Sequence, residues 1–205
     1  MKNPISLILI LILTLTFAGC QPQVAQKVKE SVSKVTQKET EKDPYADWQI
    51  FENQKHKFSF KYPAGWELSE NVDRPDLYTL TLSRKDISQE KVMVYTEEMD
   101  AAYSINISVE PNTKGFSAEE SYLDMFGESS KAKAKEGIEE VTFGGVTGIK
   151  YPEFAAPSSG PATGILIAHN EKLYRFVYGA LAHQETHEKY LPEFMDILKT
   201  LKFLD

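Results

Sequence analysis

Alternation of apolar and polar side chains is the dominant pattern of the chain after residue 48, and it predicts strands. In residues 58–62 three aromatic side chains alternate with Ser59 and Lys61, and the same period of two recurs in residues 78–82 and 105–109. Successive side chains of a strand point to opposite faces, so each segment offers one face to a core and one nearer to solvent. Shorter strands are predicted at residues 92–96, 141–143, 146–151, 165–168 and 173–178.

Two hairpins are predicted among these strands. Gly144-Gly145 is a turn dipeptide that joins the strands on either side of it, and residues 169–172 join the last two strands. Residues 173–178 are apolar on both faces. We therefore expect this strand to lie centrally in a sheet that is covered on both sides.

One helix is predicted in the middle of the chain. Ser117 and Glu120 form a capping-box pair, and apolar residues follow in residues 122–126. The pattern predicts a helix that starts at about Ala118 and continues into the lysine-rich residues 131–135.

A second helical pattern stands near the carboxyl end. Apolar residues between Leu191 and Leu201 form one face of an amphipathic helix. Pro192 is expected to break this helix or to start a new one, with a short piece before it from about Gln184. Residues 201–203 are expected to form a strand stub or a packed tail. Helices at two points and mostly antiparallel strands predict an α+β domain, an antiparallel β-sheet flanked by helices, over residues 48–205.

The amino-terminal residues follow a different pattern. Lys2 precedes an apolar run at residues 5–17, and Ala18-Gly19-Cys20 follows it. Charge, apolar core and small residues make up the layout of a secretory signal. The run has 13 residues, fewer than the roughly 18 of a membrane-spanning helix. Residues 1–19 are therefore predicted to be a signal peptide.

Cys20 is the only cysteine of the chain, so no disulfide can form within it. Its setting resembles the lipobox of bacterial lipoproteins, although Phe17 stands where leucine is usual. The resemblance implies a diacylglycerol on the Cys20 sulfur, cleavage before Cys20 and acylation of the new amino terminus, as with palmitate. The alternatives are an ordinary secretory signal or an uncleaved anchor helix. Gln21 after the cysteine favours the outer membrane if the cell has two, by the same resemblance.

Residues 20–47 are predicted to be a tether between the lipidated cysteine and the domain. They are rich in Gln, Lys, Glu, Ser, Thr and Val, and have no aromatic residue before Tyr45. Four valines recur at helical spacing, so the segment is either a flexible or partly helical stalk or a helix that docks on a partner.

Charge narrows the choice of partners. Lys and Arg total 23 and Asp and Glu total 30, a net charge of −7. Removal of residues 1–19 takes away only Lys2, which leaves 22 − 30 = −8. An acidic protein is repelled by phosphate backbones, so nucleic acid is not expected as a partner. The acidic charge is more compatible with a partner protein than with nucleic acid.

The motif Phe58-Ser59-Phe60-Lys61-Tyr62-Pro63-Ala64-Gly65-Trp66 resembles the opening of PsbP-like domains. Residues 164–178 resemble the late hairpin of that family, and residues 194–203 its closing helix. The resemblance implies an α/β/α sandwich around an antiparallel sheet. It also implies a role beside a membrane complex, which is photosystem II if the organism is photosynthetic. Packing alone also explains the aromatic residues of the motif.

His183 and His187 are candidates for a metal site. They are four residues apart and would share a helix face, a spacing that suits zinc, with Glu188 as a further oxygen ligand. Gln184 stands where the catalytic glutamate of a metalloprotease motif would be, and no third histidine follows. The alternative is two exposed histidines at a solvated helix start.

Glu97, Glu98 and Asp100 form an acidic patch that could hold calcium, a ligand attributed to photosystem relatives of the resembling family. The register of an EF-hand loop is missing, so a solvated charged loop is the alternative. Residues 153–161 are expected to form an irregular crossing loop. Its uncharged stretch suits either a partner contact or a simple connector.

No motif for nucleophilic catalysis or for phosphate binding occurs in the sequence, so neither a catalytic residue nor a cofactor is predicted. The chain is predicted to be a lipid-anchored, extracytoplasmic, non-enzymatic accessory or assembly factor for a membrane or envelope complex. The alternative is a ligand-binding or hydrolytic envelope protein with a pocket between sheet and helix. Perturbed carboxylates, or the two histidines in a concave pocket, would favour that alternative.

Overall fold

A computed structural model describes residues 43–84, 91–94, 97–100, 102–153, 160–181 and 184–205. Residues 42–205 form one compact unit. Its strands are β1 (Gln49–Asn53), β2 (Phe58–Tyr62), β3 (Trp66–Arg74), β4 (Leu77–Arg84), β5 (Lys91–Val94), β6 (Glu97–Asp100), β7 (Ala102–Pro111), β8 (Glu139–Phe143), β9 (Val146–Glu153), β10 (Ala162–His169), β11 (Lys172–Leu181) and β12 (Lys202–Phe203). Its helices are α1 (Ala118–Asp124), α2 (Glu128–Lys135) and α3 (Gln184–Lys199).

The largest sheet has seven strands in the order β3-β4-β7-β11-β10-β9-β8, and all neighbours are antiparallel. β11 is the middle strand, as the apolar pattern of residues 173–178 predicts. Tyr174, Phe176 and Tyr178 are buried on one face of β11, and Leu173 packs against a second core on the other. The predicted α+β class is confirmed.

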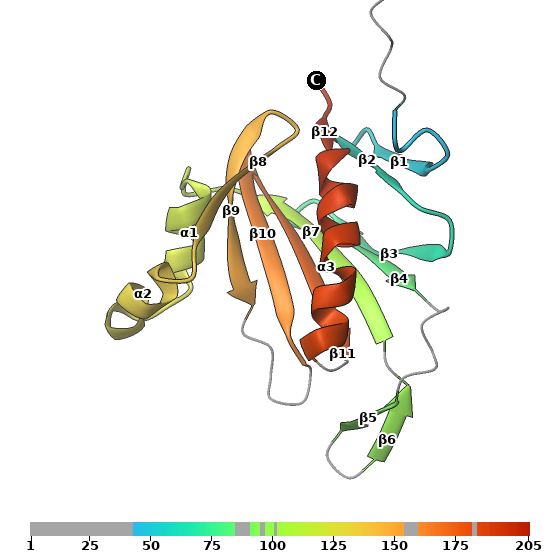
Figure 1. Ribbon diagram of the computed structural model, residues 1–205. Coiled ribbons are helices and arrows are strands. Elements are labelled where there is room, and N and C mark those ends of the chain that lie inside the picture. The colour runs from blue at the N-terminus through green and yellow to red at the C-terminus, as the bar shows by residue number, and fades with distance from the viewer. Residues whose placement is uncertain (1–42, 85–90, 95–96, 101, 154–159, 182–183) are drawn as a thin grey trace, which may run out of the picture. The chain divides into compact units, whose positions relative to one another are not determined.

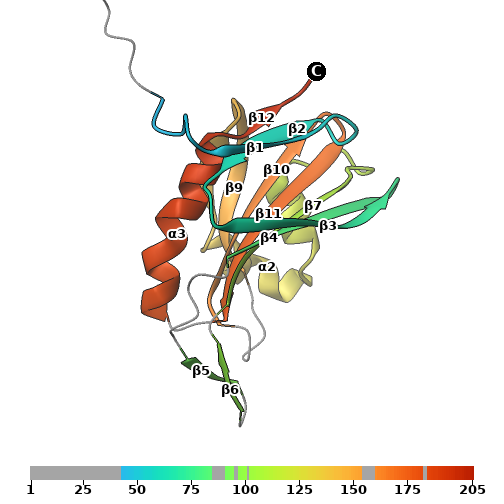
Figure 2. The same cartoon turned by 90° about the vertical axis from the view of Figure 1, so that its right-hand side faces the viewer.

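The two faces of this sheet are covered by different elements (Figure 1 and Figure 2). α3 and a three-stranded sheet, β1-β2-β12, cover one face and enclose the larger core, which is rich in aromatic residues. α1 and α2 lie on the opposite face, over a smaller core that includes Tyr122, Tyr151 and Leu166. β5 and β6 form a separate two-stranded sheet between β4 and β7 in the chain.

The late hairpins have the predicted turns. Gly144 and Gly145 join β8 to β9 with φ values of 58° and 77°. Asn170 and Glu171 join β10 to β11 with φ values of 47° and 59°. Positive φ at both central residues is the type I′ geometry that matches the twist of the paired strands.

The motif residue Trp66 connects the sheet to α3. Its ring is buried at the start of β3, and its Nε1 donates to Glu193 Oε1 over 2.9 Å. Arg84 on β4 donates from Nη1 to the other oxygen of Glu193 over 2.5 Å. One carboxylate of α3 thus holds two neighbouring strands at the edge of the sheet.

The middle helix is shorter than predicted, because it is divided into α1 and α2. The backbone N–H groups of Met125 and Phe126 donate three residues back, to Tyr122 and Leu123, which tightens the chain into a turn. Gly127 then takes an extended conformation as the N-cap of α2. A glycine loses more backbone freedom in a helix than other residues, so it favours a break at this point.

The carboxyl-terminal helix differs from the prediction in the opposite way. α3 continues through Pro192 without a break. Proline has no backbone N–H, so the Glu188 carbonyl loses its hydrogen bond within the helix. Pro192 and Glu188 are both exposed, so this carbonyl lies on the solvent side of the helix. Burial of Phe194, Ile197 and Leu198 on the opposite side supplies the packing that keeps the helix continuous. The predicted strand stub is β12, which pairs with β2.

Candidate functional site

Polar and charged side chains surround α1 on its face of the seven-stranded sheet. α1 starts at the predicted capping box. Ser117 Oγ accepts from the Glu120 backbone N–H over 3.2 Å, and Glu120 Oε2 accepts from the Ser117 backbone N–H over 2.8 Å. Ala118 and Tyr122 of α1 are buried against β9 and β10. This fixes the helix against the strands beneath it.

A polar cluster lies beneath α1, beside the small core. The Arg175 side chain on β11 donates from Nε to the Tyr151 hydroxyl over 2.9 Å and from Nη2 to Glu153 Oε1 over 2.6 Å. Tyr151 and Glu153 both come from β9. The Tyr122 ring of α1 packs on the Tyr151 ring with a centroid separation of 4.3 Å. The cluster therefore joins one helix and two strands.

The two phenols of this cluster are protonated over the physiological range. Burial raises the pKa of Tyr151 and, less strongly, that of Tyr122. They are available as hydrogen-bond donors and not as bases. The Tyr122 hydroxyl and Glu153 Oε2 are buried and have no hydrogen-bond partner within the described part of the chain.

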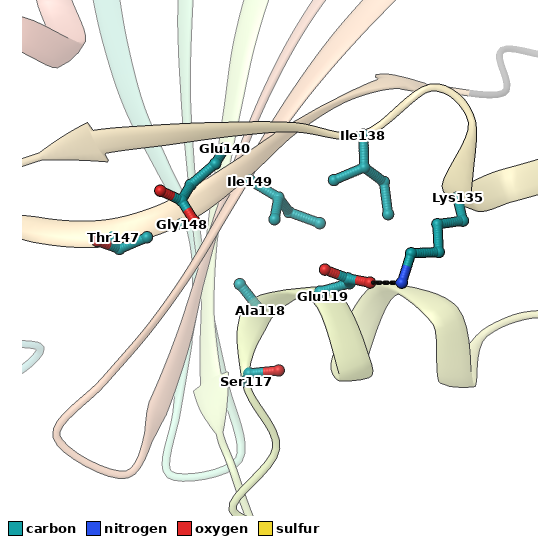
Figure 3. Close-up of a pocket in the computed structure, with 9 residues that line it drawn as sticks. All are labelled: Ser117, Ala118, Glu119, Lys135, Ile138, Glu140, Thr147, Gly148 and Ile149. Atoms are coloured by element: carbon teal, nitrogen blue, oxygen red, sulfur yellow. Dashed lines mark ion pairs between the residues drawn. The ribbon is translucent and has the colours of Figure 1, made fainter.

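One pocket lies between α1, α2 and the β8–β9 hairpin and has a volume of about 330 Å³. Figure 3 shows Ile138 and Ile149 facing its centre, with Glu119, Lys135 and Glu140 around it. Lys135 Nζ and a Glu119 carboxylate oxygen form an ion pair of 2.8 Å across the two helices. The pocket thus has an apolar floor and a charged rim.

A second pocket, of about 300 Å³, lies where α1 faces the ends of β7 and β11. Arg175 and Ser121 line it, and the Ser121 hydroxyl is buried without a hydrogen-bond partner in the described structure. Met125, which also lines this pocket, is 56% exposed. Apolar and polar groups are therefore mixed on both sides of α1.

The structure places His187 in a setting that the sequence did not predict. The residue is 4% exposed, and its ring is stacked on Tyr178 with a centroid separation of 4.7 Å. Nε2 lies 3.2 Å from Thr163 Oγ1, and Nδ1 has no partner among the described residues. The interpretation of His187 as an exposed residue at a solvated helix start is wrong. His183 lies outside the described residues.

His187 lines a pocket with a volume of about 560 Å³. The Thr163–His187 contact has the polar atoms of a nucleophile and a base. Among the described residues no third group orients the imidazole, since Nδ1 has no partner there. Burial lowers the pKa of His187. His187 in a pocket is one of the two settings expected of a ligand-binding or hydrolytic protein; His183 is not described.

Other predicted site residues are placed only in part. Cys20 and residues 154–159 of the predicted crossing loop lie outside the described residues. Glu97, Glu98 and Asp100 lie on β6 and not on a loop. In the ranges that the structure describes, no group of three or more His, Cys, Asp or Glu side chains is placed to hold a metal ion. No described helix is long and apolar enough to cross a membrane.

Sequence reasoning missed the cluster around Arg175, although one signal pointed to it. Arg175 interrupts a strand that is otherwise apolar on both faces. A guanidinium at the centre of a covered sheet needs a carboxylate or other acceptors. The strand pattern alone did not show which strand would supply them, because pairing partners depend on the sheet order.

No family model matches the chain, and no curated protein matches it in sequence. Solved structures match it in fold. Cyanobacterial PsbP (CyanoP) from Synechocystis sp. PCC 6803 is 13% identical over 77% of this chain and 93% of that protein, with a TM-score of 0.46. The architecture that the resemblance to PsbP-like domains implied, an antiparallel sheet with helices on both faces, is present in the structure itself (Figure 1).

Two further solved structures are similar. A protein of Bacteroides thetaiotaomicron VPI-5482 is 15% identical over 78% of this chain and 49% of its own, with a TM-score of 0.42. LpqN, described as involved in cell envelope biogenesis of Mycobacterium tuberculosis, is 11% identical over 80% of this chain and 87% of its own, with a TM-score of 0.41. At these identities the similarity concerns the fold alone.

Proposed function

We propose that the protein is a lipid-anchored, extracytoplasmic accessory protein that binds another protein of a membrane or envelope complex and catalyses no reaction. Anchoring is supported by residues 1–20, in which a signal-like run ends at the only cysteine of the chain. The acidic charge of the domain supports a protein partner over nucleic acid.

The surface around α1 is the observation that carries the binding role. Two open pockets lie on either side of this helix, each with apolar residues beside charged ones. Met125 at the edge of one of them is one of two large hydrophobic side chains that are exposed in the described structure. Methionine, arginine and aromatic residues are enriched in protein interfaces, and a partner would cover the exposed Met125.

The test is affinity capture from native membranes with a tag placed after Asp205. We expect a stoichiometric membrane complex with the unaltered chain. Met125→Glu should abolish capture of the partner, because it places a charge at the centre of the proposed interface. The matched control is Ile50→Glu, since Ile50 on β1 is the other exposed large hydrophobic residue, at 68%.

Two outcomes would contradict the proposal. Recovery of the tagged protein alone from membranes would argue against a stable partner. A complex that survives Met125→Glu but is lost with Ile50→Glu would assign binding to the β1-β2-β12 sheet in place of α1.

A second function, a ligand-binding envelope protein, is favoured by one observation. Arg175 lines the pocket of about 300 Å³ and its side chain is 37% exposed, so a small ligand can reach it. Thermal-shift screening of the purified full chain against small carboxylates and sugars tests this function. A stabilising ligand whose effect is lost in Arg175→Lys would support it, because lysine lacks the planar fork of arginine.

A further inference from the structure

β8 is an open edge of the seven-stranded sheet. It pairs with β9 on one side, and no described strand pairs with its other side. Its register with β9 is unbroken from Glu139 to Phe143. The opposite edge strand, β3, is irregular, because its register shifts between Glu70 and Val72. A bulge of that kind twists an edge away from further pairing, so β8 is the better template for an added strand.

The turn of the hairpin determines which backbone groups of β8 point outward. A two-residue type I′ turn is flanked by a hydrogen-bonded pair, here Phe143 and Val146. Hydrogen-bonded and non-hydrogen-bonded pairs then alternate along an antiparallel ladder. The N–H and C=O groups of Thr142 and Glu140 therefore point away from β9, toward the open edge.

The pocket shown in Figure 3 borders this edge. Glu140 lies opposite Ile149 and Thr142 lies opposite Thr147, so these side chains share the face of the sheet that α1 and α2 cover. Glu140, Thr147 and Ile149 all line the pocket. A strand added beside β8 would place every second side chain on this face, next to the apolar floor.

The negative charges on β8 disfavour pairing with a second copy of this chain and favour pairing with a basic segment. Glu139 and Glu140 are both exposed on β8. Lys150 forms an ion pair of 2.9 Å with Glu139, whereas no ion pair is recorded for Glu140 in the described structure. Two copies of this chain paired along β8 would bring these carboxylates together, which is unfavourable. A basic segment would be attracted instead.

We propose that an extended segment of a partner protein pairs with the open edge of β8, with one apolar side chain in the pocket and a lysine or arginine facing Glu140. This inference rests on the proposed function and specifies the partner's chemistry. Backbone hydrogen bonds to an open edge provide affinity, and the pocket that receives alternate side chains provides selectivity.

The experiment is selection of random peptides displayed on phage against the full chain in detergent. The selected peptides should carry an apolar residue with lysine or arginine two residues away. Thr142→Pro removes the outward N–H without removing a bond to β9, and should weaken binding of these peptides about tenfold or more. Thr142→Val is the matched control, since it removes the same hydroxyl and keeps the N–H.

A second variant keeps the proposal testable if Thr142→Pro fails to fold. Glu140→Lys should change the selected residue from basic to acidic. The proposal is overturned if selected peptides bind Thr142→Pro as well as Thr142→Val, or if their charge is unchanged by Glu140→Lys. It is also overturned if no peptide is selected.

Hydrogen exchange identifies other occupants. The Glu140 and Thr142 amides should exchange rapidly in the chain alone and slowly with a selected peptide. Slow exchange without peptide would assign the edge to another segment of this chain, and slow exchange only at high protein concentration to a second copy. Either result overturns the proposal. Capture of a partner from membranes remains a separate test of the proposed function.

Discussion

Gly164 shows how one missing Cβ shapes the core beneath α1. It lies on β10 directly opposite Tyr151 of β9. A Cβ at this position would stand 2.3 Å from Tyr151 Cζ and 2.6 Å from the Tyr151 hydroxyl oxygen. The tyrosine ring therefore lies across the glycine, and this position brings its hydroxyl to Arg175.

Gly164→Ala is expected to lower the free energy of unfolding by about 1–3 kcal/mol, because the added methyl group displaces the Tyr151 ring in a packed core. Gly179→Ala on the neighbouring strand is the control. Its Cβ would meet no atom within 4 Å, so we expect a change within about 0.5 kcal/mol. Urea denaturation measures both, and equal effects would contradict this account of Gly164.

The burial of His187 should make the stability of the protein depend on pH. Burial holds the pKa of His187 below its ordinary value in the folded protein. The unfolded chain therefore binds a proton more readily, so stability is lost as the pH falls from about 6.5 through the folded pKa. A proton on Nδ1 would also be a donor without an acceptor.

Urea denaturation at about pH 7.5 and about pH 5.5 measures this loss. His187→Gln should reduce the difference between the two free energies, since glutamine does not titrate. Thr113→Ala, at an exposed residue whose side chain does not titrate, should leave the difference as in the unaltered chain. An unchanged difference in His187→Gln would show that other groups cause the pH dependence.

Residue-level prediction from sequence worked where the cause is local. The Ser117–Glu120 capping box depends on residues three apart, and both of its hydrogen bonds are present. The burial of His187 depends on Tyr178 and Thr163 from two strands of the sheet. No pattern within one segment carries that information, because it arises only when α3 packs on the sheet.

At the level of elements, α3 shows how tertiary packing overrides a local break. A proline in a helix interior costs roughly 3 kcal/mol relative to alanine. Pro192 nevertheless lies inside a continuous helix whose other side is buried in the larger core. The helix is therefore held by its apolar face and by the contact between Glu193 and Trp66.

Pro192→Ala is expected to raise the free energy of unfolding by about 1–3 kcal/mol, because alanine restores the hydrogen bond to the Glu188 carbonyl and removes the ring clash. Thermal and urea unfolding measure the gain. Glu188→Ala, an exposed substitution in the same helix, should change stability by about 0.5 kcal/mol or less. A loss of stability in Pro192→Ala would mean that the proline ring itself packs favourably.

Strands were more predictable than helices for a physical reason. Alternation in residues 58–62 and 105–109 follows from burial of one face, and the structure has β2 and β7 there. The break between α1 and α2 lies at Gly127, a residue of low helix propensity that is extended as the N-cap of α2. The apolar spacing of residues 122–126 alone does not show it, because the period of a helix does not mark where the helix ends.

At the scale of the whole molecule, the amino-terminal segment and the folded domain should be separable. Cys20→Ser removes the thiol that lipidation requires, while the described domain uses no cysteine. We expect the variant to move from the membrane fraction to the soluble fraction, since loss of the proposed acyl chains would remove about 0.8 kcal/mol of membrane affinity per buried methylene.

The thermal unfolding of the domain should be the same in the Cys20→Ser variant and in the unaltered chain. Binding to the partner complex should be lost, and the yield of the captured complex measures it. Full yield without the lipid would show that anchoring is not required for partner binding.

The pairing of β12 with β2 has a consequence for the order of events during production of the protein. Lys202 and Phe203 complete a sheet whose other strands stand at the opposite end of the domain sequence, and the Leu204 backbone N–H donates to the Lys57 carbonyl over 3.0 Å. A chain that emerges from its amino end first, from a ribosome or a translocation channel, cannot form these contacts until residues 202–204 have emerged. Closure of the larger core is therefore a late step, and deletion of residues 202–204 should slow folding more than their small number suggests.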